Sequence, residues 1–252
     1  MKLSVVIPAH NEEGCLEGTI RPLHQKLAEE KIEHEIVVVD DHSSDGTPRI
    51  LDSLRRDISE LRAVRNGSSP GFGRAVEAGL KSSTGGAVAV YMADASDSPE
   101  DLVRFFRTME QEKVDCVFGT RFAPESKVVD YPWIKLVINR AANTFIRVLF
   151  RLRYNDVTNA FKLYRRNVIE GVQPILSPHF NLTVELPLKA IVRGFSYAVV
   201  PNSWTNRKQG ESKLKIKEMG SRYLFIVLYC LIEKWLSCGD YVKKAAAEAA
   251  LR

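Results

Sequence analysis

Short apolar runs alternate with amphipathic stretches along the first 120 residues of the chain. The apolar runs are rich in β-branched residues, which is typical of buried strands, and the stretches between them have the apolar spacing of helices. The predicted strands are 2–7, 35–40, 61–65, 87–92 and 115–119, and the predicted helices are roughly 12–30, 48–57, 73–83 and 99–112. This alternation predicts an α/β fold whose central, mostly parallel sheet carries helices on both faces.

The second half of the chain has longer amphipathic patterns. Residues 133–153 predict a helix with an apolar stripe, and three arginines form another stripe of it. Further predicted elements are a strand at 161–166, a helix near 181–193, a strand at 195–201 and a final helix at 217–237. We expect most apolar residues of the first and last of these helices to pack against the sheet. The alternative is that both helices lie on a membrane surface, as basic amphipathic helices do.

Composition and charge narrow the class of protein. The chain is 45% hydrophobic and 27% charged, as in soluble globular proteins, and its net charge is +5. The first hundred residues hold most acidic clusters, whereas ten Lys or Arg residues accompany three acids between Arg121 and Arg166. This asymmetry suggests a cation site beside anionic ligands. The four cysteines lack metal or redox spacing, which fits a reducing, cytosolic location.

Polar motifs follow the predicted strands, at the sheet edge where ligands bind in such folds. In the motif PAHNEE, Asn11 is either a helix cap or a ligand contact. Asp41 ends the second strand, where a carboxylate can accept hydrogen bonds from a base or a ribose hydroxyl. Gly71 and Gly73 precede the third helix, where glycines let backbone N–H groups approach a phosphate, although turn chemistry explains most such pairs.

The motif YMADASDSPEDL carries four carboxylates after the fourth predicted strand. The Ser-Pro pair at 98–99 predicts a helix start, which accounts for Glu100 and Asp101 as first-turn acids. Asp94 and Asp97 precede that start and have no such explanation. Two neighbouring carboxylates predict a hard divalent cation, Mg²⁺ or Mn²⁺. The alternative is a solvated acidic loop.

The ordered motifs PAHNEE, VVVDDHSSDGT, GFGRA, MADASD, GTR and RKQGESKLK resemble family 2 glycosyltransferases of the GT-A fold. The chain is most similar to their polyprenyl-phosphate branch, which includes dolichol-phosphate mannose synthases. The resemblance implies a Rossmann-like GT-A domain at 1–217, with a nucleotide-sugar-binding half at 1–120 and an acceptor half at 121–217. A C-terminal amphipathic helix and tail follow at 218–252.

The resemblance also implies a set of site residues. Asp94 and Asp97 would hold the metal that bridges the donor diphosphate. The family pattern is Asp-x-Asp, so which of the two acids touches the ion stays open. The nucleoside pocket would be lined by Pro8, Asn11, Glu12 and Asp41, with Gly73 at a phosphate. Phosphates of donor or acceptor would be held by Arg121, Arg207, Ser212 and Lys213.

The implied function is metal-dependent, inverting transfer of a hexose from GDP-mannose or a UDP-sugar to a polyprenyl or dolichyl phosphate. The enzyme would be peripheral on the cytoplasmic face of the membrane, and we expect no nucleic-acid partner. An acceptor phosphate is already an anion at neutral pH, since phosphate monoesters titrate near pH 6, so this reaction requires no general base.

Two other functions stay open. A soluble family 2 glycosyltransferase acting on a sugar hydroxyl would need a carboxylate base, for which Asp156 and Glu185 are the candidates. A non-catalytic nucleotide-sugar-binding module would bind the donor without turnover.

Overall fold

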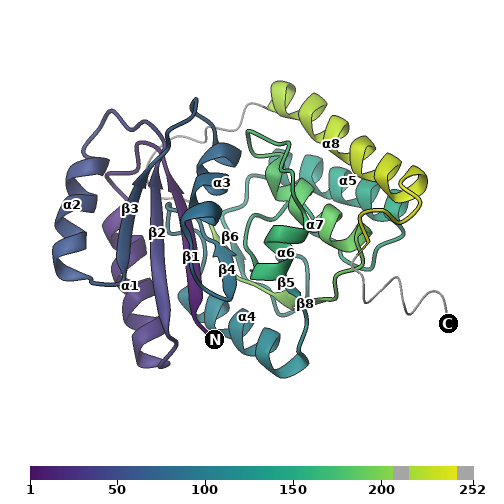
Figure 1. The fold of residues 1–252 in the computed structure, drawn as a ribbon. Coiled ribbons are helices and arrows are strands. Elements are labelled where there is room, and N and C mark those ends of the chain that lie inside the picture. The colour runs from purple at the N-terminus through teal and green to yellow at the C-terminus, as the bar shows by residue number, and fades with distance from the viewer. Residues whose placement is uncertain (207–215, 243–252) are drawn as a thin grey trace.

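A seven-stranded sheet forms the centre of the molecule (Figure 1). The structure is a computed structural model that describes residues 1–206 and 216–242. The strand order is β3-β2-β1-β4-β7-β5-β8, and only β7 runs antiparallel to its neighbours. The strands are β1 (Leu3–Ala9), β2 (His34–Asp40), β3 (Leu61–Arg65), β4 (Ala87–Val90), β5 (Cys116–Thr120), β7 (Lys162–Arg165) and β8 (Tyr197–Pro201). The predicted mostly parallel sheet is confirmed.

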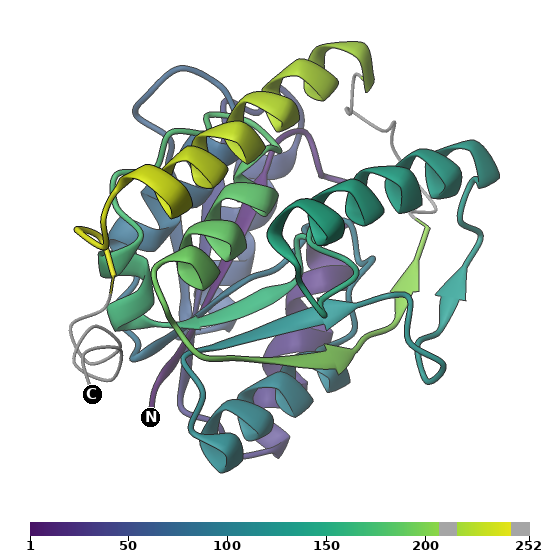
Figure 2. The same ribbon diagram turned by 90° about the vertical axis from the view of Figure 1, so that its right-hand side faces the viewer.

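Helices cover both faces of this sheet (Figure 2). One face carries α1 (Leu16–Glu29), α2 (Thr47–Asp57) and α4 (Pro99–Glu112). The other carries α3 (Phe72–Ser82), α5 (Trp133–Phe150), α6 (Arg166–Gly171), α7 (Leu182–Val192) and α8 (Ile216–Leu236). Along β1, Val5 and Ile7 pack into one core and Val6 into the other. This double burial explains why the central strands are continuous apolar runs.

Most element bounds agree closely with the sequence prediction, and α4 agrees at both ends. The hydroxyl of Ser98 accepts a hydrogen bond from the N–H of Asp101, and Pro99 is the first helical residue. The predicted helix start, with Glu100 and Asp101 in its first turn, is therefore confirmed. Helix α1 begins later than predicted, because the residues between β1 and α1 form a loop that is hydrogen-bonded to the loop after β2.

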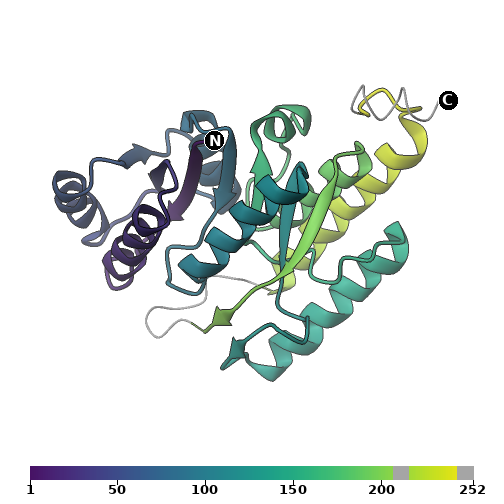
Figure 3. The same cartoon turned by 90° about the horizontal axis from the view of Figure 1, so that it is seen from below.

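The sequence prediction missed α6 and a small second sheet. Strands β6 (Val128–Val129) and β9 (Trp204–Thr205) pair in parallel as a two-stranded ribbon. The ribbon lies beyond the end of β8 and beside the start of α5 (Figure 3). It therefore ties the beginning of α5 to the segment that follows the sheet.

The apolar stripe of α5 faces outward, contrary to the expected packing against the sheet. Trp133 is 73% exposed and Val148 is 69% exposed, and the helix instead buries Asn143, Ile146 and Phe150. The expectation was wrong because helical spacing reveals an apolar face without saying what covers it. Exposed apolar side chains gathered on one helix face are typical of surfaces that contact a partner or a membrane.

Helix α8 is also apolar on its outer side. Its side chains at Leu224, Phe225, Leu228 and Ile232 are exposed, while Ile226, Val227 and Cys230 are buried. The helix is attached to α7 through Arg193, whose guanidinium donates to both carboxylate oxygens of Glu233 at 2.7 and 2.9 Å. Within residues 1–206 and 216–242, no helix has the length and apolar character that crossing a bilayer demands.

Candidate active site

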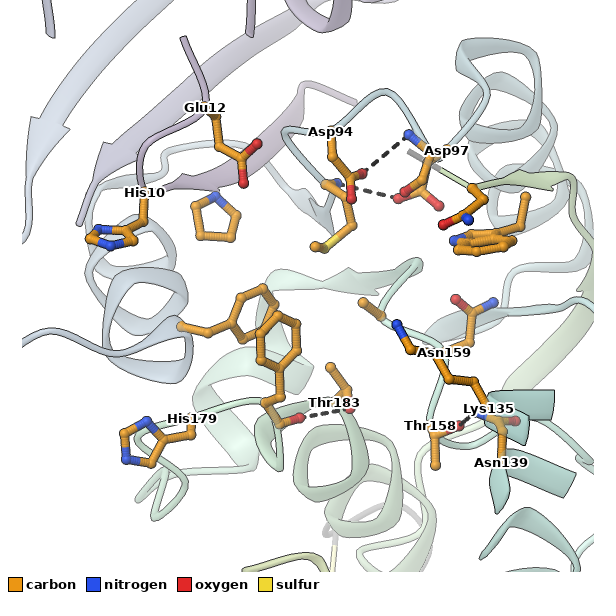
Figure 4. A pocket seen from close by; sticks show the side chains of 18 of the residues that line it. His10, Glu12, Asp94, Asp97, Lys135, Asn139, Thr158, Asn159, His179 and Thr183 are labelled. Atoms are coloured by element: carbon orange, nitrogen blue, oxygen red, sulfur yellow. Dashed lines mark hydrogen bonds between the residues drawn. The ribbon is translucent and has the colours of Figure 1, made fainter. Parts of the chain in front are cut away.

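A cavity of about 700 Å³ opens where β1, β2 and β4 end. These strands are neighbours in the order β2, β1, β4, so the residues that follow them succeed one another along the sheet edge. Asp41, Glu12 and Asp94 line the cavity in this way. The opposite wall comes from the second half of the chain, including Lys135 of α5 and His179 before α7 (Figure 4). The cavity is therefore lined from both the first 120 residues and the later part of the chain.

The loop after β1 is hydrogen-bonded to the loop after β2. The Asn11 Oδ1 atom accepts from the Ser44 N–H at 2.8 Å, and the Asn11 N–H donates to the Ser43 hydroxyl at 3.0 Å. The Glu13 carboxylate accepts from the Gly46 N–H at 2.6 Å. Asn11 thus lies outside the cavity lining and does not cap α1, whereas Pro8 and Glu12 line the cavity. Asn11 therefore joins the loop after β1 to the loop after β2.

Asp41 lies at the β2 end of the cavity. One carboxylate oxygen accepts from the Asn66 side chain at 2.6 Å, and the other accepts from the Gly71 N–H at 2.8 Å. Gly71 lines the cavity but Gly73 does not. The Gly73 N–H donates to the Pro178 carbonyl at 3.0 Å, so the backbone group predicted to approach a phosphate has a partner within the protein.

Asp94 and Asp97 lie on a tight loop after β4, and both line the cavity. Their side chains are oriented by backbone groups of the same loop: the Ser96 N–H donates to Asp94 and the Met92 N–H to Asp97, each at 3.2 Å. Both residues are largely buried, with exposed fractions of 8% and 6%. Burial, with the neighbouring Asp94 charge, raises the pKa of Asp97 to about 7.

This pair suits a hard divalent cation. Burial first, and then repulsion from the Asp94 carboxylate, raise the pKa of Asp97, and a cation would offset both costs of ionising it. In the described part of the chain, no cluster of three or more His, Cys, Asp or Glu side chains could hold a metal by itself. Mg²⁺ and Mn²⁺ fit such a partial set, because these ions keep waters and bind substrate phosphates beside one or two carboxylates.

The raised pKa of Asp97 predicts a pH-dependent response to metal. Without metal, the folded protein binds the Asp97 proton more tightly than the unfolded chain does. Protonation of Asp97 therefore adds to the free energy of unfolding at low pH, and this contribution is lost as pH rises through 7. Because a cation binds the ionised pair, we expect Mn²⁺ to raise the melting temperature more at about pH 8 than at about pH 6. Differential scanning fluorimetry checks this, and Asp97→Asn should remove the pH dependence. Equal Mn²⁺ shifts at the two pH values in the wild type would contradict it.

Arg121 lines the cavity and forms a buried ion pair with Asp156. Its Nε and Nη2 atoms donate to the two carboxylate oxygens of Asp156, both at 2.8 Å, and its backbone N–H donates to the same carboxylate at 2.9 Å. The guanidinium also lies 5.6 Å from the ring centre of Tyr131. Arg121 is therefore held in place in the cavity wall, with part of its charge balanced by Asp156.

Side chains of α5 and the loop before β7 form a polar group at the far end of the cavity. The Thr158 hydroxyl accepts from the side-chain amides of Asn139 and Asn143, each at 2.9 Å. Lys135 lies one turn before Asn139 and therefore on the same side of α5. Figure 4 shows Lys135, Asn139 and Thr158 across the cavity from Asp94 and Asp97. This end therefore presents a cation, amides and a hydroxyl.

Lys162 supports this end from inside the protein. Its ammonium group is buried and donates to the carbonyls of Val157 at 3.0 Å, Thr183 at 3.1 Å and Asn159. Burial lowers the pKa of Lys162 to about 7. The side chain joins the segment that carries Thr158 and Asn159 to the first turn of α7.

Neither predicted candidate base is available for catalysis. Asp156 is fully buried, and both its oxygens accept from Arg121. Glu185 is also fully buried, and its oxygens accept from the N–H groups of Leu176 and Ser177 and from Lys189. Among described residues, the carboxylates that line the cavity are Glu12, Asp41, Asp94 and Asp97. All four follow β1, β2 or β4, away from the Lys135 end.

A second cavity of about 300 Å³ continues from the Lys135 end between α5 and α8. It shares Tyr131, Lys135, Asn139, Thr158 and Tyr223 with the first. Its own lining is apolar and includes Ile138, Phe145, Leu224 and Val227. An apolar groove between the two outward-facing helices therefore leads into the polar cavity.

Sequence reasoning found only part of this site. Of the predicted site residues, those that line the cavity are Pro8, Glu12, Asp41, Asp94, Asp97 and Arg121. Arg207, Ser212 and Lys213 lie outside the described residues. The lining residues that the sequence reasoning missed include Lys135, Asn139, Thr158, His179, Phe180 and Arg222. No nearby motif in the sequence marks these residues, because they reach the cavity only through the packing of distant segments.

Comparisons with known proteins agree with this geometry. Residues 4–172 match the family model described as Glycosyl transferase family 2. The chain is 33% identical over 216 residues to the polyprenol monophosphomannose synthase of Mycolicibacterium smegmatis, covering 83% of this chain and 80% of that protein. It is 27% identical over 240 residues to the undecaprenyl-phosphate mannosyltransferase of Micrococcus luteus, covering 93% and 96%.

Solved structures share the fold at low sequence identity. Glucosyl-3-phosphoglycerate synthase from Mycobacterium tuberculosis, in complex with Mn²⁺, UDP and phosphoglyceric acid, has a TM-score of 0.66 at 18% identity, covering 92% of this chain and 78% of that one. S. aureus TarS in complex with UDP-GlcNAc also has a TM-score of 0.66, at 19% identity, covering 94% and 68%. These likenesses show a shared fold. The chain belongs to glycosyltransferase family 2, and the predicted resemblance to its polyprenyl-phosphate branch is confirmed.

Proposed function

We propose that this enzyme transfers a hexose from a nucleoside-diphosphate sugar, GDP-mannose or a UDP-sugar, to a polyprenyl phosphate at a membrane surface. One observation carries the proposal: the acceptor end of the cavity presents Lys135, Asn139 and Thr158, has no described carboxylate, and opens into the apolar groove between α5 and α8. A phosphate on an apolar chain matches this combination of charge and shape. The names of both mannosyl-transferring relatives support the same acceptor class.

The acceptor chemistry fits a site without a base. An oxygen of the acceptor phosphate attacks the anomeric carbon of the sugar, and the bond from that carbon to the donor diphosphate breaks. The nucleoside diphosphate leaves with the electron pair, and the anomeric configuration inverts. Because the phosphate is already an anion at neutral pH, no residue must remove a proton. Lys135 would hold the attacking phosphate, and Arg121 would stabilise the negative charge that develops in the cavity.

The metal in this proposal would be Mg²⁺ or Mn²⁺, held by Asp94 and Asp97. When bound, such an ion neutralises charge on the departing diphosphate. Pro8, Glu12 and Asp41 would contact the nucleoside. Arg207 and Lys213, in the basic segment after β9, remain proposed phosphate contacts.

The apolar faces of α5 and α8 would lie on the membrane. Trp133 and Val148 of α5 and Phe225 of α8 are each more than half exposed, and the groove runs between these helices. A lipid acceptor could then present its phosphate to Lys135 while its chain stays in an apolar environment. Arginines of α5 would add attraction to anionic lipid, worth about 1 kcal/mol for each one near the surface.

The cytoplasmic face of the membrane is the proposed location. Cys15, Cys116, Cys230 and Cys238 are free thiols, as in proteins of reducing compartments.

Flotation with vesicles tests the membrane part of the proposal. We expect the protein to float with anionic vesicles and Val148→Glu with Phe225→Glu to abolish flotation, because charges on this face oppose burial in lipid. Val199→Glu, which alters an exposed valine on β8, is the matched control and should float like the wild type. Unchanged flotation of the double variant would contradict the assigned membrane face.

A thermal-shift screen tests the donor part. We expect one or more nucleoside-diphosphate sugars to stabilise the protein in Mn²⁺, and the shift to shrink after chelation. Stabilisation without transfer to any acceptor would instead favour the non-catalytic binding module.

A further inference from the structure

Residues 176–180, here named the clasp, cross from the acceptor half of the chain to the start of α3. The Pro178 carbonyl accepts hydrogen bonds from the N–H groups of Gly73 at 3.0 Å and Arg74 at 3.4 Å. These N–H groups belong to the first turn of α3, where backbone N–H groups find no acceptor within the helix itself. The clasp therefore caps a helix of the donor half.

The sequence GFG at 71–73 is shaped to receive the clasp. A Cβ atom at Gly73 would overlap the Ser177 carbonyl oxygen, and one at Gly71 would overlap that of Pro178. Between the glycines, the Phe72 ring stacks on Phe180 with centroids 4.1 Å apart and an interplanar angle of 11°. Close backbone approach thus explains the glycine pair, of which Gly73 was the predicted phosphate contact.

Buried groups of the acceptor half hold the other side of the clasp. The Glu185 carboxylate accepts from the N–H groups of Leu176 at 2.8 Å and Ser177 at 2.7 Å. The Asn181 side chain donates to the Ser177 hydroxyl at 2.8 Å. The clasp backbone is therefore fixed from both halves of the protein.

This arrangement places His179 near the Asp41 end of the cavity. The His179 Nδ1 atom lies 3.4 Å from the position that a Cβ would take at Gly71, and the Gly71 N–H donates to Asp41 at 2.8 Å. His179 lines the cavity, and Figure 4 shows it on the same side as His10 and away from Asp94 and Asp97. The imidazole therefore lies beside the Asp41 end, away from the proposed metal.

We infer that His179 contacts the nucleoside of the donor and helps to determine which donor is bound. The inference rests on the proposed function, because it takes the ligand to be a nucleoside-diphosphate sugar. An imidazole offers both a hydrogen-bond donor and an acceptor, and the Asp41 carboxylate offers acceptors, so together they suit the mixed polar edge of a base or a ribose. The donor site then includes a residue from the acceptor half of the chain.

Binding measurements on the full-length chain test this inference. Isothermal titration calorimetry in Mn²⁺ should compare GDP, UDP and inorganic pyrophosphate with the wild type, His179→Ala and His179→Gln. For the nucleoside diphosphate that the wild type binds best, we expect His179→Ala to lower the affinity by about tenfold, which is the effect of one lost hydrogen bond. Pyrophosphate affinity should not change, and His179→Gln should recover part of the loss. His24→Ala, which removes an imidazole from α1 outside the cavity lining, is the matched control.

The contrary outcomes are distinct. Unchanged nucleotide affinity in His179→Ala would overturn the inference and leave the proposed function intact. Equal losses for nucleotide and pyrophosphate would also overturn it, because they would place the effect on the phosphates or on the fold. If the wild type bound neither nucleotide, both the proposed function and this inference would fall. Gly73→Ala gives a second test, since displacing the clasp should weaken nucleotide binding at least as much as His179→Ala.

Discussion

Replacing both Asp94 and Asp97 by asparagine should reduce metal-dependent transfer by about 1,000-fold or more. Asparagine keeps the side-chain shape but removes the two charges that would hold the cation. Metal stabilisation of a departing diphosphate is worth several kcal/mol, and each 1.4 kcal/mol is about tenfold in rate. Steady-state transfer rates over a Mn²⁺ titration measure the loss. The two single variants show which acid ligates the metal directly. The variant that lacks the direct ligand should need the higher Mn²⁺ concentration to reach half of its maximal rate.

Glu100→Gln is the matched control for these variants. Glu100 belongs to the same acidic stretch but lies in the first turn of α4, where its carboxylate accepts from the Ser98 hydroxyl. Its replacement should leave the Mn²⁺ requirement unchanged. Full activity of the Asp94 and Asp97 double variant would show that the metal site has been assigned to the wrong residues.

Lys135→Met should lower kcat/KM for the lipid phosphate by about 100-fold, comparable to losing one preorganised stabilising donor in an active site. Methionine preserves the apolar stem of the side chain and removes only the charge at the entrance of the groove. Donor affinity, measured by titration of the nucleoside diphosphate in Mn²⁺, should not change, because Lys135 lies across the cavity from Asp94 and Asp97.

Arg140→Met provides the comparison for this effect. Arg140 is on the same helix, is exposed, and lies 4.5 Å from the Phe122 ring centre, outside the cavity lining. The Arg140→Met variant should lose more in vesicle binding than in acceptor kcat/KM, when the latter is measured at saturating vesicle concentration. A Lys135→Met enzyme with unchanged acceptor kcat/KM would contradict the placement of the acceptor phosphate.

Much of the fold could be predicted because its main signals are local. Strands buried on both faces are continuous apolar runs, and the Ser-Pro pair at 98–99 marks the start of α4. The same local rule separated Asp94 and Asp97 from Glu100 and Asp101. In the structure, Asp94 and Asp97 line the cavity.

The rest depended on tertiary placement that a single sequence does not encode locally. The stripe of α5 has the spacing of a core face, yet Trp133 and Val148 face outward. Gly73 looked like a phosphate contact, but its N–H meets the Pro178 carbonyl, more than a hundred residues away. His179 and Lys135 join the cavity only because distant segments pack around it, and no nearby motif marks either residue.

The central claim is that the acceptor is a phosphate on an apolar chain, and one comparison tests it most directly. Anionic vesicles should carry either polyprenyl phosphate or polyprenol of the same length, with Mn²⁺ and labelled GDP-mannose or UDP-sugars supplied in turn. The proposal predicts transfer from one of these donors to the phosphate but not to the alcohol, with an inverted anomeric carbon in the product by NMR. Equal transfer to polyprenol, or transfer to a soluble sugar hydroxyl with none to polyprenyl phosphate, would contradict it.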